Sequence, residues 1–185
     1  MWNNIWNEKG QTLLELIAVL AVGMIVVAAL TFATIASLRN ARFSQNQSQA
    51  TKLAQEGIEK VRALRDRDGE MVTTITLPNS DPARTINKFS ELWSVYLSKN
   101  HCNTPDLSDE DACFFRFDNS GLFGQTSQGS YEQILENNLE RQILISDDSL
   151  NDTKAGQEKK VTVIVRWSDF SGSHNSRLST ILRKL

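Results

Sequence analysis

The chain is organised around one stretch near its N-terminus, "KGQTLLELIAVLAVGMIVVAALTFATIA", which runs from Lys9 to Ala36. From Leu16 onward this stretch holds about 21 residues without a charge, and about 20 apolar residues let a helix cross the hydrocarbon core of a membrane. The run therefore predicts a membrane-spanning helix. One carboxylate, Glu15, stands directly before the run, and an unpaired charge costs about 2.5–3.5 kcal/mol at the centre of a membrane helix. Glu15 therefore needs a partner.

Taken over the whole chain, the composition is that of an ordinary soluble domain. The 185 residues carry a formal net charge of −2, and 23% of them are charged. The sequence contains two histidines and shows no P-loop, nucleophile elbow or dinucleotide-binding glycine pattern, so it predicts neither an enzyme nor a bound cofactor. The sequence pI is about 5.7. Beyond Arg62, Arg65 and Arg67, which alternate with acidic residues and predict a solvated helix end, no basic stripe suggests a nucleic-acid partner.

The position of a glycine separates this segment from an ordinary signal peptide, whose apolar part spans about 7–15 residues. Gly10 stands at the start of the stretch, apolar residues follow almost at once, and Glu15 lies five residues past the glycine. This pattern resembles the N-terminus of the type IV pilin-like family. The resemblance implies that a prepilin peptidase cleaves after Gly10 and methylates the new N-terminal residue, Gln11. In that family the first residue of the mature chain is most often phenylalanine, so Gln11 departs from the common pattern.

The same resemblance gives Glu15 a partner. Cleavage creates an α-amino group on Gln11 that is positively charged at neutral pH. In a packed filament, this amine of one subunit lies against the glutamate of its neighbour. Because desolvation offsets much of the attraction in a buried ion pair, such a pair fixes packing register more than it adds stability. We therefore expect Glu15 to act in assembly.

The resemblance also implies a location and partners. We expect a single-pass inner-membrane protein with its head outside the cytoplasm. It would bind other pilin or pseudopilin subunits and the inner-membrane assembly platform, and then enter an extracellular or periplasmic filament. A type IV pilus, a type II secretion system and a DNA-uptake machine all stay open. The second reading is a signal-anchored extracytoplasmic protein whose head binds a ligand, and under that reading Glu15 has no role.

Helical spacing continues beyond the apolar run. Small and apolar residues recur at Ala50, Leu53, Ala54, Gly57, Ile58, Val61 and Leu64. We therefore expect a leader peptide at 1–10 and one long helix over 11–68. Residues from about 12–38 would form its membrane or filament-core half, and residues from about 39–68 the spine of the head. Two helices joined between residues 40 and 48 are the alternative.

The head, residues 69–185, begins with a strand-like segment at Met71–Leu77. Pro82 is then typical of a first helical turn. Apolar residues follow it at helical spacing, namely Ile86, Phe89, Trp93, Tyr96 and Leu97. We expect a second, amphipathic helix here, with its aromatic stripe in the core rather than in a ligand site.

Three later segments, "ACFFRFD", "RQILIS" and "KVTVIVRW", hold the β-branched and aromatic residues typical of strands. In the last of them Val161, Val163, Val165 and Trp167 share one face. The final segment, "RLSTILRKL", is expected to return antiparallel after a turn. A strand ending in Val-x-Trp before a hairpin also resembles the head of minor pilins and pseudopilins. The prediction is an α+β, pilin-like fold, with the long N-terminal helix packed on an antiparallel sheet of about four strands.

Two cysteines, Cys102 and Cys113, belong to the head, and a disulfide is permitted outside the cytoplasm. Closing a loop of about 12 residues contributes roughly 2–3 kcal/mol of stability in the chain-entropy treatment. Free thiols and a metal site including His101 are the alternatives, although no second ligand pair has zinc-finger spacing. Acidic clusters within 106–111 and 147–152 do not follow the EF-hand pattern. We therefore predict a disulfide and no metal.

Overall fold

The computed structural model describes residues 7–75, 84–94, 113–127, 129–134, 138–147 and 157–185. Its elements, in chain order, are helix α1 (Asn7–Arg67), β1 (Glu70–Ile75), β2 (Arg84–Lys88), the 3-10 helix η1 (Phe89–Ser94), β3 (Cys113–Phe117), β4 (Phe123–Thr126), β5 (Glu132–Ile134), β6 (Leu139–Ser146), β7 (Glu158–Asp169) and β8 (Gly172–Arg183). The chain divides into two compact units, Met1–Gln45 and Asn46–Leu185.

Helix α1 passes without a break through residues 40–48. The prediction of one long helix is therefore confirmed, and the two-helix alternative is wrong. The glutamine-, asparagine- and serine-rich segment there contains no proline, so each of its residues can keep its backbone hydrogen bond in the helix.

The end of α1 is fixed by a Schellman motif. The Gly69 N–H donates to the Leu64 carbonyl at 2.8 Å, and the Asp68 N–H donates to the Arg65 carbonyl at 3.2 Å. Asp68 adopts a φ of 48° at the position where glycine is usual. Its carboxylate accepts a hydrogen bond from the Ser90 N–H at 2.8 Å, and this bond lowers the pKa of Asp68. One side chain therefore joins the helix end to η1.

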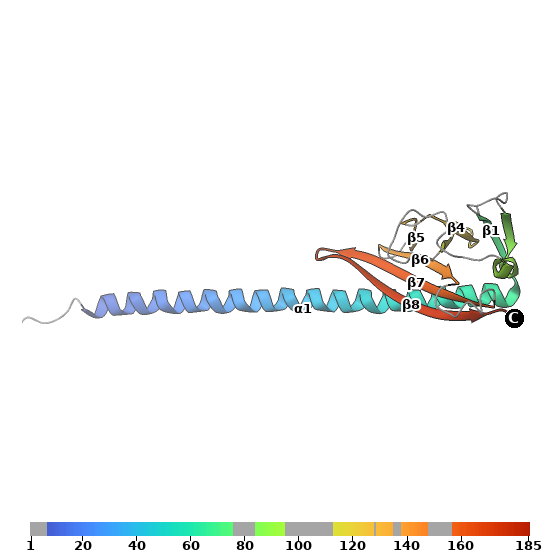
Figure 1. Ribbon diagram of the computed structural model, residues 1–185. Helices are drawn as coiled ribbons and strands as arrows, with labels where there is room; N and C mark the ends of the chain where they lie inside the picture. Colours follow the sequence, from blue (N-terminus) through green and yellow to red (C-terminus); the bar gives the residue numbers. More distant parts are fainter. Residues whose placement is uncertain (1–6, 76–83, 95–112, 128, 135–137, 148–156) are drawn as a thin grey trace, which may run out of the picture. The chain divides into compact units, whose positions relative to one another are not determined.

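All eight described strands form one sheet in the order β2-β1-β4-β3-β6-β7-β8, with β5 beside β6. The pairings are antiparallel except that of β1 with β4. Strands β7 and β8 are the longest and form a hairpin whose last pair is Asp169 with Gly172 (Figure 1). Gly172 has a φ of 129°, which a residue with a side chain rarely adopts. The antiparallel return of the final segment is therefore confirmed.

The sheet is larger than the predicted four strands. The segments predicted as strands form β1, β3, β6, β7 and β8, whereas β2, β4 and β5 were not expected. Strand β4 has four residues and β5 has three, and neither has an alternating apolar pattern. Both owe their conformation to pairing with longer strands, β4 with β3 and β5 with β6. The strand conformation of these two segments therefore depends on pairing with residues that are distant in the sequence.

The predicted second helix is wrong. Residues 84–88 form β2, which pairs with β1, and the next six residues form η1. The core role of the apolar residues is nevertheless confirmed, because Ile86, Phe89 and Trp93 are all buried. A strand followed by a 3-10 turn buries these three positions as well as a helix would, and pairing with β1 selects the strand. Tyr96 and Leu97 lie outside the described residues.

The core of the second unit lies between the last part of α1 and one face of the sheet (Figure 1). The helix contributes Ala50, Ala54, Ile58, Val61 and Leu64, each at most 8% exposed. The sheet contributes the predicted face of β7, namely Val161, Val163, Val165 and Trp167, each at most 2% exposed. The two apolar patterns found in the sequence therefore pack on each other.

Candidate functional site

The three residues expected to act in processing and assembly lie on the first turns of α1. Gly10 and Gln11 are helical, and Glu15 follows Gln11 by four residues, so both occupy one face of the helix. The Glu15 side chain is exposed in this single chain. An acidic residue near a helix N-terminus is favoured by the helix dipole, and cleavage before Gln11 would place Glu15 close to such an end.

The apolar side chains on both sides of Glu15 in the sequence are exposed. From Leu13 to Phe43 the large apolar residues are between 41% and 74% exposed. The described part of the chain holds one helix long and apolar enough to cross a membrane; its most apolar 18-residue segment has a mean hydropathy of 2.8, and none of that segment is buried. A soluble monomer rarely leaves so large an apolar surface in water. This exposed apolar surface fits a membrane-anchored protein.

The polar groups of the run differ in how they are satisfied. Thr31 and Thr34 donate hydrogen bonds from Oγ1 to the carbonyls of Val27 and Leu30, each at 2.8 Å. Both hydroxyl groups are thus satisfied within the helix, as an apolar environment demands. A carboxylate cannot be satisfied in this way, because it only accepts hydrogen bonds and the carbonyls of a helix accept them as well. Glu15 therefore needs a hydrogen-bond donor other than the backbone of its own helix.

The comparison with protein families agrees with this geometry. Residues 7–31 match the family described as the prokaryotic N-terminal methylation motif. The chain has the N-terminus of a type IV pilin-like prepilin. The matched range includes Gly10, Gln11 and Glu15. No curated protein and no solved structure matches the chain.

The prepilin motif carries several general consequences. It implies processing by a prepilin peptidase and assembly with other pilins, and it belongs to structural rather than enzymatic proteins. Together with the apolar helix, it fits a membrane-anchored protein with its head outside. The fold of the described residues, a long helix followed by a mainly antiparallel sheet, is an α+β pilin-like architecture.

The head also contains a buried charged residue whose partners are far from it in the sequence. Arg141 of β6 is only 2% exposed. Its Nε and Nη2 donate to the two carboxylate oxygens of Glu132 at 2.8 Å each, and its Nη1 donates to the Leu53 carbonyl of α1 at 3.1 Å. The same Nη1 lies 3.6 Å from Glu56, and the guanidinium lies 5.9 Å from the centre of the Phe117 ring. Arg141 therefore joins the sheet to the helix.

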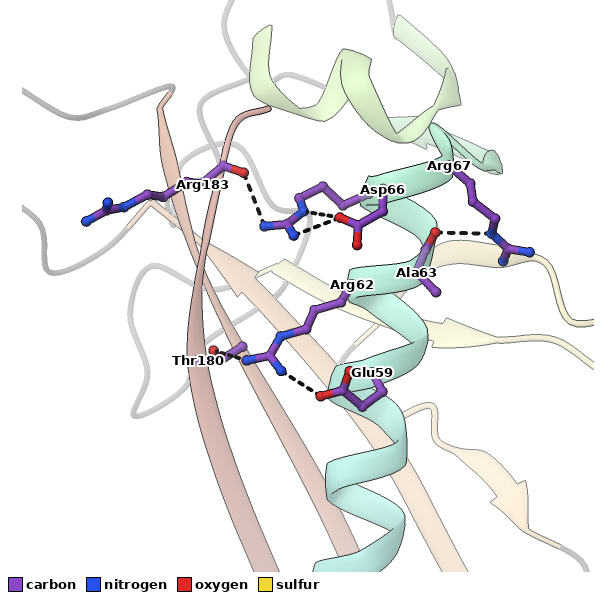
Figure 2. Close-up of polar contacts among 8 residues, drawn as sticks. Glu59, Arg62, Ala63, Asp66, Arg67, Thr180 and Arg183 are labelled. Atoms are coloured by element: carbon purple, nitrogen blue, oxygen red, sulfur yellow. Dashed lines mark hydrogen bonds and ion pairs between the residues drawn. The ribbon is translucent and has the colours of Figure 1, made fainter.

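A second group of hydrogen bonds and ion pairs lies at the C-terminal end of α1 (Figure 2). Arg62 donates to Glu59 at 2.6 Å and to the Thr180 hydroxyl of β8 at 3.1 Å. Arg65 donates to Asp66 at 2.8 Å and to the Arg183 carbonyl of β8 at 3.4 Å, and its side chain is 19% exposed. The prediction of a solvated helix end therefore holds for Arg67, which is exposed, whereas Arg65 is half-buried beside β8.

The predicted disulfide stays a prediction. Cys102 lies outside the described residues, and only the backbone of Cys113 is described, in β3. Within the described ranges no group of three or more histidine, cysteine or acidic residues is placed to hold a metal ion. Of the acidic clusters considered for calcium, only Asp147 is described, and it forms an ion pair with Lys159 at 2.7 Å.

Proposed function

We propose that this protein is a minor pilin of a type IV pilus or a pseudopilin of a type II secretion system. A prepilin peptidase cleaves the chain after Gly10 and methylates Gln11. The apolar half of α1 holds the protein in the inner membrane and later packs among the helices of other subunits. The assembly platform of that membrane moves it into the filament, and the head stays outside the cytoplasm.

One observation carries the proposal: the methylation motif lies on a helix whose apolar side chains are exposed from Leu13 to Phe43. The motif supports processing, and the exposed helix supports a move from lipid to a bundle of similar helices. Glu15 is the one carboxylate in this surface, and the new amine on Gln11 of a neighbouring subunit is the partner we assign to it. A signal-anchored ligand-binding protein explains the helix but gives no function to the motif.

Cleavage is expected between Gly10 and Gln11 when the protein is made together with a prepilin peptidase. N-terminal sequencing should then begin at Gln11. Gly10→Ala should leave the chain uncut, because the peptidase of this family depends on the glycine. Gly23→Ala is the matched control, since a Cβ at Gly23 meets no atom within 4 Å, and it should be cut normally. An uncut wild-type chain, or equal cutting of the Gly10→Ala variant, would contradict the processing step.

Cys102 and Cys113 are expected to be joined in the exported head, because both lie outside the cytoplasm and are close in sequence. Mass analysis of the unreduced protein should give a mass lower by two hydrogens than that of the reduced protein. Complete alkylation of both thiols before reduction would instead identify them as free.

A further inference from the structure

The described sheet ends at β2 on one side and at β8 on the other, and these two edges differ. Strand β2 has five residues, and the register of its pairing with β1 shifts between Glu70 and Thr73. Strand β8 has 12 residues, and all of them pair with β7 without a shift. A short strand, a bulge or a proline commonly protects an edge, because a long regular edge is a template for another strand. Strand β8 has none of these three protections.

One hydrogen bond shows which backbone groups of β8 point away from β7. The Lys184 N–H, directly after β8, donates to the carbonyl of Gln157, directly before β7, at 2.8 Å. Alternate residues of an antiparallel strand direct their N–H and C=O groups to the same neighbour. The even-numbered residues from Gly172 to Lys184 therefore bond toward β7, and the odd-numbered residues direct both groups outward.

The outward-directed residues are accessible over most of the strand. The side chains of the odd-numbered residues before Arg183 are all exposed, namely those of Ser173, Asn175, Arg177, Ser179 and Ile181. At the end of β8, the Arg183 carbonyl accepts a hydrogen bond from Arg65 of α1 at 3.4 Å (Figure 2). Arg65 therefore closes one end of this edge. We call the segment Ser173–Ile181 the outer edge.

The side chains of the outer edge favour one kind of partner strand. Ser173, Asn175 and Ser179 are short, so another backbone can come close to the strand. Arg177 stands among them, and Gly172–Leu185 holds two arginines and one lysine but no acidic residue. Opposite charges that face each other across two strands stabilise the pairing, and like charges destabilise it. The outer edge therefore favours an acidic strand.

A second copy of this chain fits the outer edge poorly. Its β8 would bring further positive charge to an edge that is already basic. Its β2, at the other end of the sheet, holds the basic residues Arg84 and Lys88 and no acidic one. Like charges therefore disfavour the pairing of β8 with either edge strand of another copy. The charge points instead to a different protein.

We propose that the outer edge binds an extended acidic segment of a different protein, which joins the sheet as an antiparallel strand. The fitting segment has an apolar residue opposite Ile181, a small polar residue opposite Ser179 and an acidic residue opposite Arg177, at alternate positions. Backbone hydrogen bonds supply the affinity, and these side chains supply the selectivity. In a filament the partner would be another kind of subunit. That consequence rests on the proposed function, whereas strand addition does not.

The test measures binding of two synthetic peptides, each as long as the outer edge, to the full-length protein in detergent. Both have valine at the first position and threonine at the third, opposite Ile181 and Ser179. The acidic peptide has glutamate at the fifth position, opposite Arg177, and the basic peptide has lysine there. The other positions are threonine. Fluorescence anisotropy of the labelled acidic peptide should show saturable binding, about fivefold tighter than that of the basic peptide.

A proline at the outer edge tests whether backbone pairing holds the peptide. Ser179→Pro removes one outward N–H, and an edge strand tolerates proline where the N–H faces solvent. The acidic peptide should bind about tenfold more weakly to this variant, because one backbone hydrogen bond is lost. Ser179→Ala is the matched control, since it also loses the hydroxyl contact with Thr162 but keeps the N–H. Its binding should match that of the unchanged protein.

A charge reversal tests the chemistry of the partner. In Arg177→Glu the preference should reverse, so that the basic peptide binds about fivefold more tightly than the acidic peptide. A reversed preference cannot come from a general loss of folding, because unfolding would weaken the binding of both peptides.

Each outcome decides the proposal. Failure of the acidic peptide to bind the unchanged protein, or undiminished binding by Ser179→Pro, would overturn strand addition at the outer edge. Equal binding of both peptides would overturn the acidic partner. A dimer of the unchanged protein that Ser179→Pro dissociates would identify a second copy as the occupant instead. Wild-type protein that never enters filaments would contradict the proposed function but leave the peptide result intact.

Discussion

Glu15→Gln and Glu15→Val are expected to abolish entry of the protein into filaments while membrane insertion and cleavage continue. Both changes make the exposed apolar surface of α1 more apolar, and neither alters Gly10, so the chain should still be inserted and cut. In the filament, each variant leaves the amine on Gln11 of a neighbouring subunit without its carboxylate. An uncompensated buried charge costs about 3–5 kcal/mol. A subunit with this loss competes poorly against unchanged subunits for the same place.

The measurement compares the amount of protein in sheared filaments with the amount in the membrane fraction. Glu15→Asp should be intermediate, because the charge is kept but the side chain is shorter. Glu59→Gln is the matched control, since it makes the same chemical change on the same helix at a side chain that is 66% exposed in the head. Its entry into filaments should be normal. Normal amounts of the Glu15→Val variant in filaments would favour the signal-anchored reading.

Segments with a strong local pattern were predictable from the sequence. The alternation from Val161 to Trp167 predicts β7 because one face of that strand is completely buried in the core. Helix α1 was predictable for the same reason, since small and apolar residues continue at helical spacing through Leu64. In contrast, the conformation of residues 84–94 depends on pairing with β1, and the spacing of Ile86, Phe89 and Trp93 fits a helix equally well.

The candidate processing site was also predictable, because its signal is local: a glycine, an apolar run and one carboxylate within a few residues. The contacts of arginine side chains that join α1 to the sheet were not, since they link residues far apart in the sequence. Arg141 meets Leu53, and Arg65 meets Arg183. The sequence did hold a partial signal for Arg141. Alternate residues of a strand share one face, so Arg141 lies on the same face as Ile143 and Ile145, which are buried in the core. A charge at an inward position of a strand indicates a buried partner without identifying it.

A deeply buried ion pair of the head joins β7 to the residue after β6. The Nζ atom of Lys159 lies 2.7 Å from each carboxylate oxygen of Asp147, and both side chains are 1% exposed. Lys159 lies on the same face of β7 as the completely buried Val161. The residue paired with it on β8 is Leu182. Burial lowers the pKa of the Lys159 ammonium, while the hydrogen bonds and charge of Asp147 oppose this effect. The Asp147 carboxylate therefore offsets part of the cost of burying the ammonium.

Lys159→Met is expected to destabilise the head by about 3–5 kcal/mol, because it leaves the Asp147 carboxylate buried without its ammonium. For a unit of this size, that loss lowers the Tm by roughly 10 °C. Tryptophan fluorescence follows the unfolding of the detergent-solubilised full chain, because Trp93 and Trp167 are both buried in the core. Lys160→Met is the matched control, since this neighbouring lysine faces the other side of the sheet, and it should change the Tm little.

The double variant Lys159→Met/Asp147→Leu separates the cost of a stranded charge from the loss of a stabilising pair. Replacing both partners of a buried ion pair by apolar residues is often neutral or stabilising, because no charge remains to be desolvated. We therefore expect the double variant to regain most of the Tm lost by Lys159→Met. If the two variants unfold at the same temperature, the loss comes from the packing of the lysine stem and not from the carboxylate of Asp147.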